Sequence, residues 1–263
     1  MRIRGGVAGW AADRLAVEEP LELRIGAETF ALTMRTPGDD HDLAVGFLLS
    51  EGVIAGAEEV LDVRACPDAG AGPNTVQVVI AGSPSAAPRR LTVTSACGVC
   101  GSASVDAVRA RLPLDVAGDA LRLDPAALAA LPGRLRERQT AFARTGGLHA
   151  AAAVDAAGTL VCVREDVGRH NAVDKVVGWA ARAGLLPLRS HVLLVSGRAS
   201  FELVQKALLA GMPALAAVSA PSSLAVDLAR SAGMTLVGFL RGDSMTVYTG
   251  AERIAAEGLT AAG

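Results

Sequence analysis

The sequence predicts an α/β protein with a largely parallel sheet in its C-terminal half and a smaller, mixed α+β N-terminal part. Three observations lead to this prediction. From residue 191 onward, short apolar segments alternate with helical ones in the order strand, helix, strand, helix, strand, strand. The strands there are nearly all apolar, as expected for strands covered on both faces. Residues 21–36 instead alternate between polar and apolar positions, as a half-buried hairpin does.

The first elements are predicted by local turn and capping signals. Residues 21–36 turn at Gly26, which predicts an antiparallel hairpin. Residues 37–54 begin with an acidic cluster, so we expect a helix that ends near Gly52. Residues 74–82 predict a further strand.

A loop rich in proline, glycine and serine is expected at residues 82–90. It leads into a strand at residues 90–96 and a helix at residues 102–112 that begins with a serine N-cap. The segment between this strand and helix holds Cys97 and Cys100.

The middle of the chain predicts a helix and a domain boundary. Asp124 and Pro125 start a helical pattern, and Pro132 with Gly133 is expected to break it. The predicted domains are residues 1–135, a mixed α+β domain that carries the cysteine pair, and residues 136–263, an α/β domain.

The α/β domain is predicted to begin with a hairpin and a helix. Residues 148–166 form the hairpin around Gly158, and residues 170–184 form an amphipathic helix that Gly184 closes. Right-handed crossovers through the next two helices would make three strands parallel. The remaining segments are strand 191–197, helix 200–211, strand 213–220, helix 222–233, strand 235–242 and strand 245–250.

Composition excludes several classes of protein. The 263 residues are 51% hydrophobic and 20% charged, which is enough for one large core or two smaller ones. The net charge of −2 leaves no broad basic surface for nucleic acid. No stretch resembles a secretion signal or a membrane span, so we expect a cytoplasmic protein with neither nucleic acid nor membrane as a partner.

Three loops of the α/β domain predict a ligand site. They follow the parallel strands, at the sheet edge where open α/β folds bind ligands. Arg198 and Arg241 could neutralise a phosphate there, and Phe239 could stack on a base. Each loop alone is better explained as a turn or helix cap, but three at equivalent positions favour a ligand. The loops are residues 196–200, 219–223 and 239–244, and the predicted contacts include Ser196, Gly197, Arg198 and Ser219.

A dense polar segment, residues 164–178, precedes these loops. It can be a solvated helix start with a capping network, or a part of the same ligand site. His170, Asn171 and Lys175 are the ligand contacts predicted from it.

Lysine is rare in this chain: Lys175 and Lys206 are the only lysines among 25 basic residues. Since the composition favours arginine so strongly, we predict that both positions exclude the larger, planar guanidinium. His149 follows two glycines, and a lone histidine of this kind is more often structural than catalytic.

The pair Cys97 and Cys100 has the spacing CxxC. Zinc needs three or four protein ligands, and Cys66 and Cys162 have no cysteine or histidine near them in sequence, so we predict no metal ligands. An iron–sulfur cluster is disfavoured for the same reason, and the motifs of a zinc deaminase are missing. Reactive sulfur remains, because thiols at a helix start ionise readily. The spacing does not distinguish a disulfide-forming pair from a persulfide carrier.

The chain as a whole resembles the formate dehydrogenase accessory sulfurtransferases, the FdhD family. The blocks that carry the resemblance follow one another over nearly the whole chain. They are EEPLELRI, TMRTPGDDHDLAVGFLLSEGVI, TSACGVCGSAS, TGGLHAAA, REDVGRHNAVDKVVG, SGRASFELVQKALLAGMPALAAVSAPSSLAVDLA and LVGFLRGDSMTVYTG.

The resemblance implies a sulfurtransferase that takes persulfide sulfur from a cysteine desulfurase. It would pass the sulfur to a bound molybdenum or tungsten bis(molybdopterin guanine dinucleotide) cofactor, which makes the formate dehydrogenase catalytic subunit active. Cys97 and Cys100 are then the catalytic sulfur carriers, with Cys97 as the persulfide. The matching cofactor-binding stretch is Phe239, Leu240, Arg241, Gly242, Asp243 and Ser244, and the chain departs from the family only after Arg241, where a further basic residue is expected.

The resemblance also implies the fold and the assembly. The C-terminal domain should have the three-layer form of cytidine deaminase without its zinc. A homodimer should offer one pocket to each guanine dinucleotide arm of the cofactor, and GDP or GTP should mimic one arm.

Two other functions remain as alternatives. A thiol–disulfide oxidoreductase is disfavoured by the lack of the Trp–Cys–Gly–Pro–Cys pattern. A cofactor chaperone that carries no sulfur would make the cysteines incidental, so that replacing both with alanine would leave formate dehydrogenase activity intact.

Overall fold

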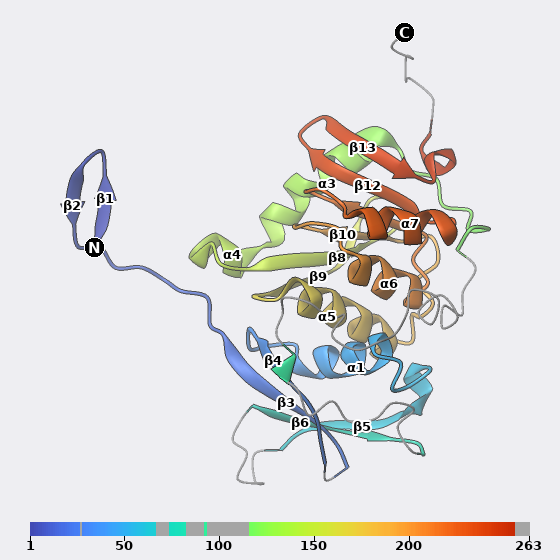
Figure 1. The fold of residues 1–263 in the computed structure, drawn as a ribbon, viewed down its shortest axis with the longest axis horizontal. Helices are drawn as coiled ribbons and strands as arrows, with labels where there is room; N and C mark the ends of the chain where they lie inside the picture. Colours follow the sequence, from blue (N-terminus) through green and yellow to red (C-terminus); the bar gives the residue numbers. More distant parts are fainter. Residues whose placement is uncertain (27, 67–73, 83–91, 94–115, 256–263) are drawn as a thin grey trace.

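In the computed structural model, two large β-sheets have helices packed between them, and a small two-stranded sheet stands at the N-terminus (Figure 1). The structure describes residues 1–26, 28–66, 74–82, 92–93 and 116–255. Cys97, Cys100 and the predicted helix at 102–112 lie outside the described residues, as does nearly all of the loop predicted at 82–90. Of the strand predicted at 90–96, the described part is β7 (Thr92–Val93).

The C-terminal sheet has six strands in the order β13, β12, β11, β10, β8, β9. The three inner strands β10, β11 and β12 are parallel, which confirms the predicted crossovers. The outer pairs are antiparallel because short hairpins join β8 to β9 and β12 to β13. The bounds are β8 (His149–Val154), β9 (Leu160–Asp166), β10 (Val192–Val195), β11 (Ala214–Ala217), β12 (Thr235–Arg241) and β13 (Ser244–Thr249).

Helices cover both faces of this sheet, so the C-terminal part has three layers. Leu193 of β10 packs in the cluster beneath α5 and α6, whereas the next residue, Leu194, packs in the cluster beneath α3. Alternate residues of a strand point to opposite faces, and both faces here are apolar. The likeness to cytidine deaminase itself stays a prediction. The helices are α3 (Pro125–Arg138), α4 (Thr140–Thr145), α5 (Arg169–Arg182), α6 (Phe201–Leu209) and α7 (Ser223–Ser231).

The N-terminal sheet has five strands in the order β5, β6, β3, β4, β7. The hairpin of β3 and β4 turns at Gly26, whose φ of 61° is readily adopted by glycine, and this confirms the predicted hairpin. Helix α1 covers one face of the sheet through a core that includes Leu43, Phe47 and Leu48. The bounds are β3 (Glu19–Ile25), β4 (Glu28–Arg35), α1 (Asp40–Ser50), the short helix η1 (Ala57–Glu59), β5 (Val60–Ala65) and β6 (Thr75–Ile80).

Helix α1 of the N-terminal part, which contains the five-stranded sheet, packs against helix α5 of the C-terminal part, which contains the six-stranded sheet. The two helices lie side by side in Figure 1. Gly46 of α1 faces the backbone of α5, and a Cβ at this position would lie 1.9 Å from the carbonyl oxygen of Asp174. Gly178 of α5 faces α1 in the same way, 1.8 Å from the carbonyl oxygen of Asp42. The two helices therefore touch through their backbones.

The prediction that Pro132 and Gly133 break a helix is wrong. Helix α3 continues through both residues to Arg138, although Pro132 cannot donate a backbone hydrogen bond. The buried side chains of Leu128, Leu131 and Leu135 hold the helix against the sheet on both sides of the proline. The start is as predicted: Asp124 caps the helix by accepting from the Ala127 amide at 2.9 Å. The predicted boundary at residue 135 falls inside this helix, and the division into two domains stays a prediction.

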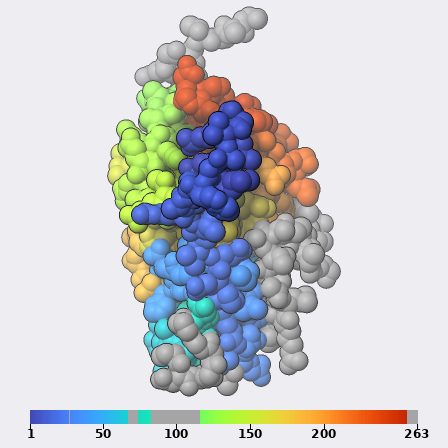
Figure 2. All heavy atoms as spheres, turned by 90° about the vertical axis from the view of Figure 1, so that its left-hand side faces the viewer, coloured from blue at the N-terminus to red at the C-terminus, as the bar shows by residue number. Residues whose placement is uncertain are grey.

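Residues 1–18 extend away from the body as an arm. The hairpin of β1 (Arg2–Arg4) and β2 (Val7–Gly9) is exposed throughout. Figure 1 shows it standing apart from the sheets, and Figure 2, which looks from that side, shows it in dark blue in front of the body. Near the C-terminus, β13 is followed by the short helix η2 (Ala251–Arg253). No helix within the described ranges combines the length and the apolar run that a bilayer crossing requires.

Candidate functional site

The three predicted loops meet at one edge of the C-terminal sheet. The Ser219 amide donates to the Gly197 carbonyl oxygen at 3.1 Å, and the Phe239 amide donates to the Ser219 carbonyl oxygen at 3.2 Å. This link confirms that the loops converge, because the three parallel strands all end at this edge. We call residues 196–200, 219–223 and 239–241 the strand-end site.

Phe239 stands in a strained backbone conformation at this site. Its φ is 51°, and the left-handed region costs a residue with a side chain about 1–2 kcal/mol. The register of β12 against β13 shifts between Gly238 and Arg241, so Phe239 lies in a β-bulge. Its ring is 41% exposed, and the Arg241 guanidinium lies 5.9 Å from the ring centroid. An exposed ring with a cation beside it suits a base and its phosphate.

The rest of the predicted stretch is a tight hairpin. Gly242, with a φ of 58°, and Asp243 connect Arg241 to Ser244 across two paired strands. Asp243 and Ser244 are exposed. The side chain of Leu240 is fully buried beneath α3, so a ligand at the edge can reach only its backbone. The predicted cofactor contacts of these residues remain predictions.

His149, which the sequence analysis regarded as structural, flanks the strand-end site. It begins β8 beside the end of β10, where the Ala150 amide donates to Ser196 Oγ at 2.9 Å. A Cβ on Gly197 would lie 3.4 Å from His149 Nδ1, so the glycine lets the loop lie against the ring. Burial lowers the pKa of His149, and the charges of Arg169 and His170 lower it further. Within the described part of the chain, the imidazole has no hydrogen-bond partner.

Helix α5 places two more polar side chains next to His149. The Nε atom of Arg169 is buried and finds no hydrogen-bond partner among the residues that the structure describes. His170 Nε2 lies 2.7 Å from Glu202 Oε2 at the first turn of α6. Arg198 is exposed in the loop after β10. Arg169 was not among the predicted residues, because a single arginine in a polar segment gives no signal of its own.

Asn171 and Lys175 are engaged in bonds within the protein. Asn171 Nδ2 donates to Asp166 Oδ1 at 3.0 Å, and both side chains are buried. Asn171 Nδ2 also donates to the Met34 carbonyl oxygen at 2.8 Å, which ties the end of β4 to α5. These bonds give no support to the cofactor contact predicted for Asn171 and Lys175. The acceptors of Lys175 Nζ are Asp166 Oδ2 at 2.8 Å, the Thr36 carbonyl oxygen at 2.9 Å and the Glu165 carbonyl oxygen at 3.3 Å.

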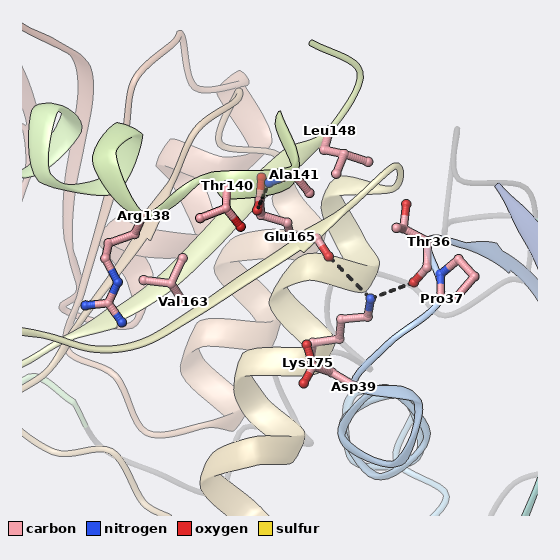
Figure 3. A pocket seen from close by; sticks show the side chains of 10 residues that line it. All are labelled: Thr36, Pro37, Asp39, Arg138, Thr140, Ala141, Leu148, Val163, Glu165 and Lys175. Atoms are coloured by element: carbon pink, nitrogen blue, oxygen red, sulfur yellow. Dashed lines mark hydrogen bonds between the residues drawn. The ribbon is translucent and has the colours of Figure 1, made fainter. Parts of the chain in front are cut away.

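A cavity of about 260 Å³ lies near the end of β9 (Figure 3). Its carboxylate Glu165 is already bound, since the amides of Ala141 and Phe142 donate to it at 2.9 and 2.8 Å. The dashed lines in Figure 3 show that Lys175 is likewise engaged. These two charged groups of the cavity are thus engaged within the protein, and the ligand site predicted at the strand ends stays a prediction. The lining residues are Thr36, Pro37, Asp39, Arg138, Thr140, Ala141, Leu148, Val163, Glu165 and Lys175.

The two described cysteines do not resemble reactive thiols. Cys162 is buried in β9, and burial raises the pKa of its thiol to about 12, so it stays protonated near neutral pH. The thiol of Cys66 donates to Gln77 Oε1 at 3.3 Å. Among the described residues, no three histidine, cysteine, aspartate or glutamate side chains are placed to hold a metal ion.

Comparisons with known proteins agree with the resemblance seen in the sequence. The model of the FdhD/NarQ family matches residues 16–255. A sulfur carrier protein FdhD from Streptomyces avermitilis is 55% identical, covering 100% of this chain and 96% of the relative. One from Nocardia farcinica is 56% identical over 92% of this chain and 88% of the relative.

A solved structure shows the same fold. It is the crystal structure of a protein from Desulfotalea psychrophila that was assigned as a formate dehydrogenase accessory protein. The TM-score is 0.75 at 25% identity, and the match covers 97% of this chain and 96% of the other. From the family model, the relatives and the shared fold together, the chain belongs to the FdhD/NarQ family.

Proposed function

We propose that this protein is a sulfur carrier for formate dehydrogenase. It takes sulfur from a cysteine desulfurase and passes it to a molybdenum or tungsten bis(molybdopterin guanine dinucleotide) cofactor, its bound substrate. The names of the relatives support the sulfur carrier function. The observation that carries the cofactor part is the backbone link from Gly197 through Ser219 to Phe239, which gathers the three loops around an exposed ring and two arginines.

The sulfur steps follow from thiol chemistry. The Cys97 thiolate attacks the terminal sulfur of the donor persulfide, the sulfur–sulfur bond of the donor breaks, and the donor cysteine leaves as a thiolate. The Cys100 thiolate then attacks Cys97 Sγ, the bond from Cys97 Sγ to the terminal sulfur breaks, and that sulfur leaves as sulfide. The two cysteines supply the two electrons for this reduction and become a disulfide. A cellular dithiol reduces that disulfide again, which fits the predicted cytoplasmic location.

The guanine dinucleotide arms fit the strand-end site. The ring of Phe239 stacks on guanine, while Arg241 and Arg198 neutralise the diphosphate. A homodimer offers two such sites, one to each arm of the cofactor. The formate dehydrogenase catalytic subunit then receives the cofactor.

Incubation with a cysteine desulfurase and cysteine is expected to add one sulfur, about 32 Da, to the peptide that contains Cys97 and Cys100, as the transfer of a persulfide sulfur requires. Mass spectrometry of a digest under non-reducing conditions measures it. The variant Cys97→Ala should lose this gain. Cys66→Ala is the matched control and should keep it, since the Cys66 thiol is already engaged by Gln77 Oε1. A peptide that gains no sulfur with the desulfurase and cysteine, but loses two hydrogens when an oxidant is added without them, would instead indicate a redox switch.

The variant Phe239→Ala is expected to weaken GDP binding by about 1–3 kcal/mol, because a base loses its stacking partner. Calorimetric titration of the full chain measures the dissociation constants. Leu185→Ala is the control, since Leu185 is similarly exposed but follows α5 at the far end of the helix. Equal affinities in both variants would show that guanine does not stack on Phe239.

A further inference from the structure

The start of β8 places one ionisable side chain against the strand-end site. His149 Nδ1 lies next to Gly197, the residue at which the backbone link between the three loops begins. No described residue forms a hydrogen bond with the imidazole, although the ring is partly buried. A half-buried imidazole without a hydrogen-bond partner can form a hydrogen bond with a ligand that binds at the strand-end site.

The charged side chains around His149 favour the binding of an anion over that of a cation. The carboxylate whose charge acts on the ring, Asp166, is already paired with Lys175 Nζ at 2.8 Å. Glu202 lies 2.7 Å from Nε2 of the neighbouring His170. The guanidinium groups of Arg169 and Arg198, by contrast, form no ion pair with any residue in the described ranges. The unbalanced charge at this place is therefore positive.

We propose that His149 takes up a proton when a phosphate or diphosphate group binds at the strand-end site, and that its imidazolium then donates a hydrogen bond to that group. This inference rests on the proposed function, in which the diphosphate of a guanine dinucleotide arm occupies the site. His149 is then a residue that contacts the substrate and makes its recognition depend on pH.

The direction of the proton transfer follows from the surroundings. In the free protein, burial lowers the pKa of His149 first, the charges of Arg169 and His170 lower it further, and Asp166 opposes them, so the neutral ring is favoured. A bound anion stabilises the charged ring and raises this pKa. At a pH between the pKa of the free protein and that of the complex, binding takes up a proton. The affinity for the anion therefore increases as the pH falls from 8 to 6. Each unit by which the pKa rises on binding gives about a tenfold gain in affinity.

The test is an NMR titration of the imidazole Cε1–H signals in the full chain, which has only four histidines. The variant His149→Gln assigns the His149 signal. The midpoint of that signal is expected to lie below pH 6.5 in the free protein and to move up by one unit or more with saturating pyrophosphate or GDP. His191 is the internal control, because it bonds to the Arg189 carbonyl oxygen at the other end of β10 and should not shift.

Affinities measured by calorimetry at pH 6 and pH 8 complete the test. The ratio of the two affinities should be about tenfold larger for the parent protein than for His149→Gln, and this comparison cancels the titration of the ligand itself. His191→Gln should behave as the parent does.

Four outcomes separate the two proposals. Pyrophosphate binding with the expected shift, but no preference for guanine, would support the His149 site and remove the guanine part of the proposed function. GDP binding with an unmoved His149 signal would overturn this inference and leave the proposed function standing. A shift with both ligands, together with tighter binding of GDP than of pyrophosphate, supports both proposals. If neither ligand binds, this inference is overturned.

Discussion

The variant Gly178→Ala is expected to lower the free energy of unfolding by about 3 kcal/mol, and Gly46→Ala by a similar amount. The added methyl group would overlap a backbone carbonyl oxygen of the opposite helix, at 1.8 Å in one case and 1.9 Å in the other. A backbone atom cannot turn away as a side chain can, so α1 and α5 must move apart. Overpacking of this kind costs about 1–3 kcal/mol or more, and the gain in helix propensity of up to about 1 kcal/mol opposes it only in part.

Gly133→Ala is the matched control for this prediction. Gly133 also lies inside a helix, but nothing lies within 4 Å of its missing Cβ. The same substitution there should raise stability by up to about 1 kcal/mol, because alanine loses less backbone entropy. Denaturant unfolding of the three variants gives the comparison. A stability gain in Gly178→Ala like that in Gly133→Ala would show that the helices are not held in contact at this point.

Local signals were sufficient to predict most of the fold. Gly26 and Gly158 marked two hairpins, and the alternation after residue 191 gave the parallel strands in the right order. These features depend on residues that are close in sequence, so a single chain reveals them. The error at Pro132 has the opposite origin: the helix survives because leucines on both sides of the proline pack against a distant sheet.

Part of the candidate site was also predictable from local sequence signals. The loops could be located because parallel strands end at one edge, and their convergence is confirmed by the bonds between Gly197, Ser219 and Phe239. The position of His149 beside Gly197 could not be predicted, since it depends on the antiparallel pairing of β8 with β10. The bulge at Phe239 also escapes sequence analysis, because nothing in the local sequence requires a positive φ there.

Lysine usage gave a prediction that the structure explains. Lys175 and Lys206 are both buried, and each forms a short ion pair, with Asp166 at 2.8 Å and with Asp174 at 2.6 Å. A guanidinium is larger and needs more partners than these sites offer. One member of each pair lies on α5, the helix that packs against α1 of the N-terminal part. The two lysines therefore stabilise the surroundings of this helix, and the cofactor contact predicted for Lys175 stays a prediction.

The variant Lys206→Met is expected to lower the free energy of unfolding by about 3–5 kcal/mol, because it leaves the Asp174 carboxylate buried without its cation. Lys206 Nζ lies 2.6 and 2.7 Å from the two carboxylate oxygens, and the Ser50 hydroxyl of α1 donates to the same carboxylate at 2.7 Å. The hydroxyl alone does not neutralise the charge. Chemical denaturation of the full chain measures the loss.

Two further variants separate the buried charge from the loss of a side chain. Arg230→Met removes a cation from an exposed pair with Asp227, at 3.5 Å on α7, and should change stability by less than about 1 kcal/mol. The double variant Lys206→Met with Asp174→Leu should recover much of the loss, because it removes both charges and leaves apolar side chains of similar volume. If the double variant were no more stable than Lys206→Met, the unpaired Asp174 carboxylate would not be the source of the loss.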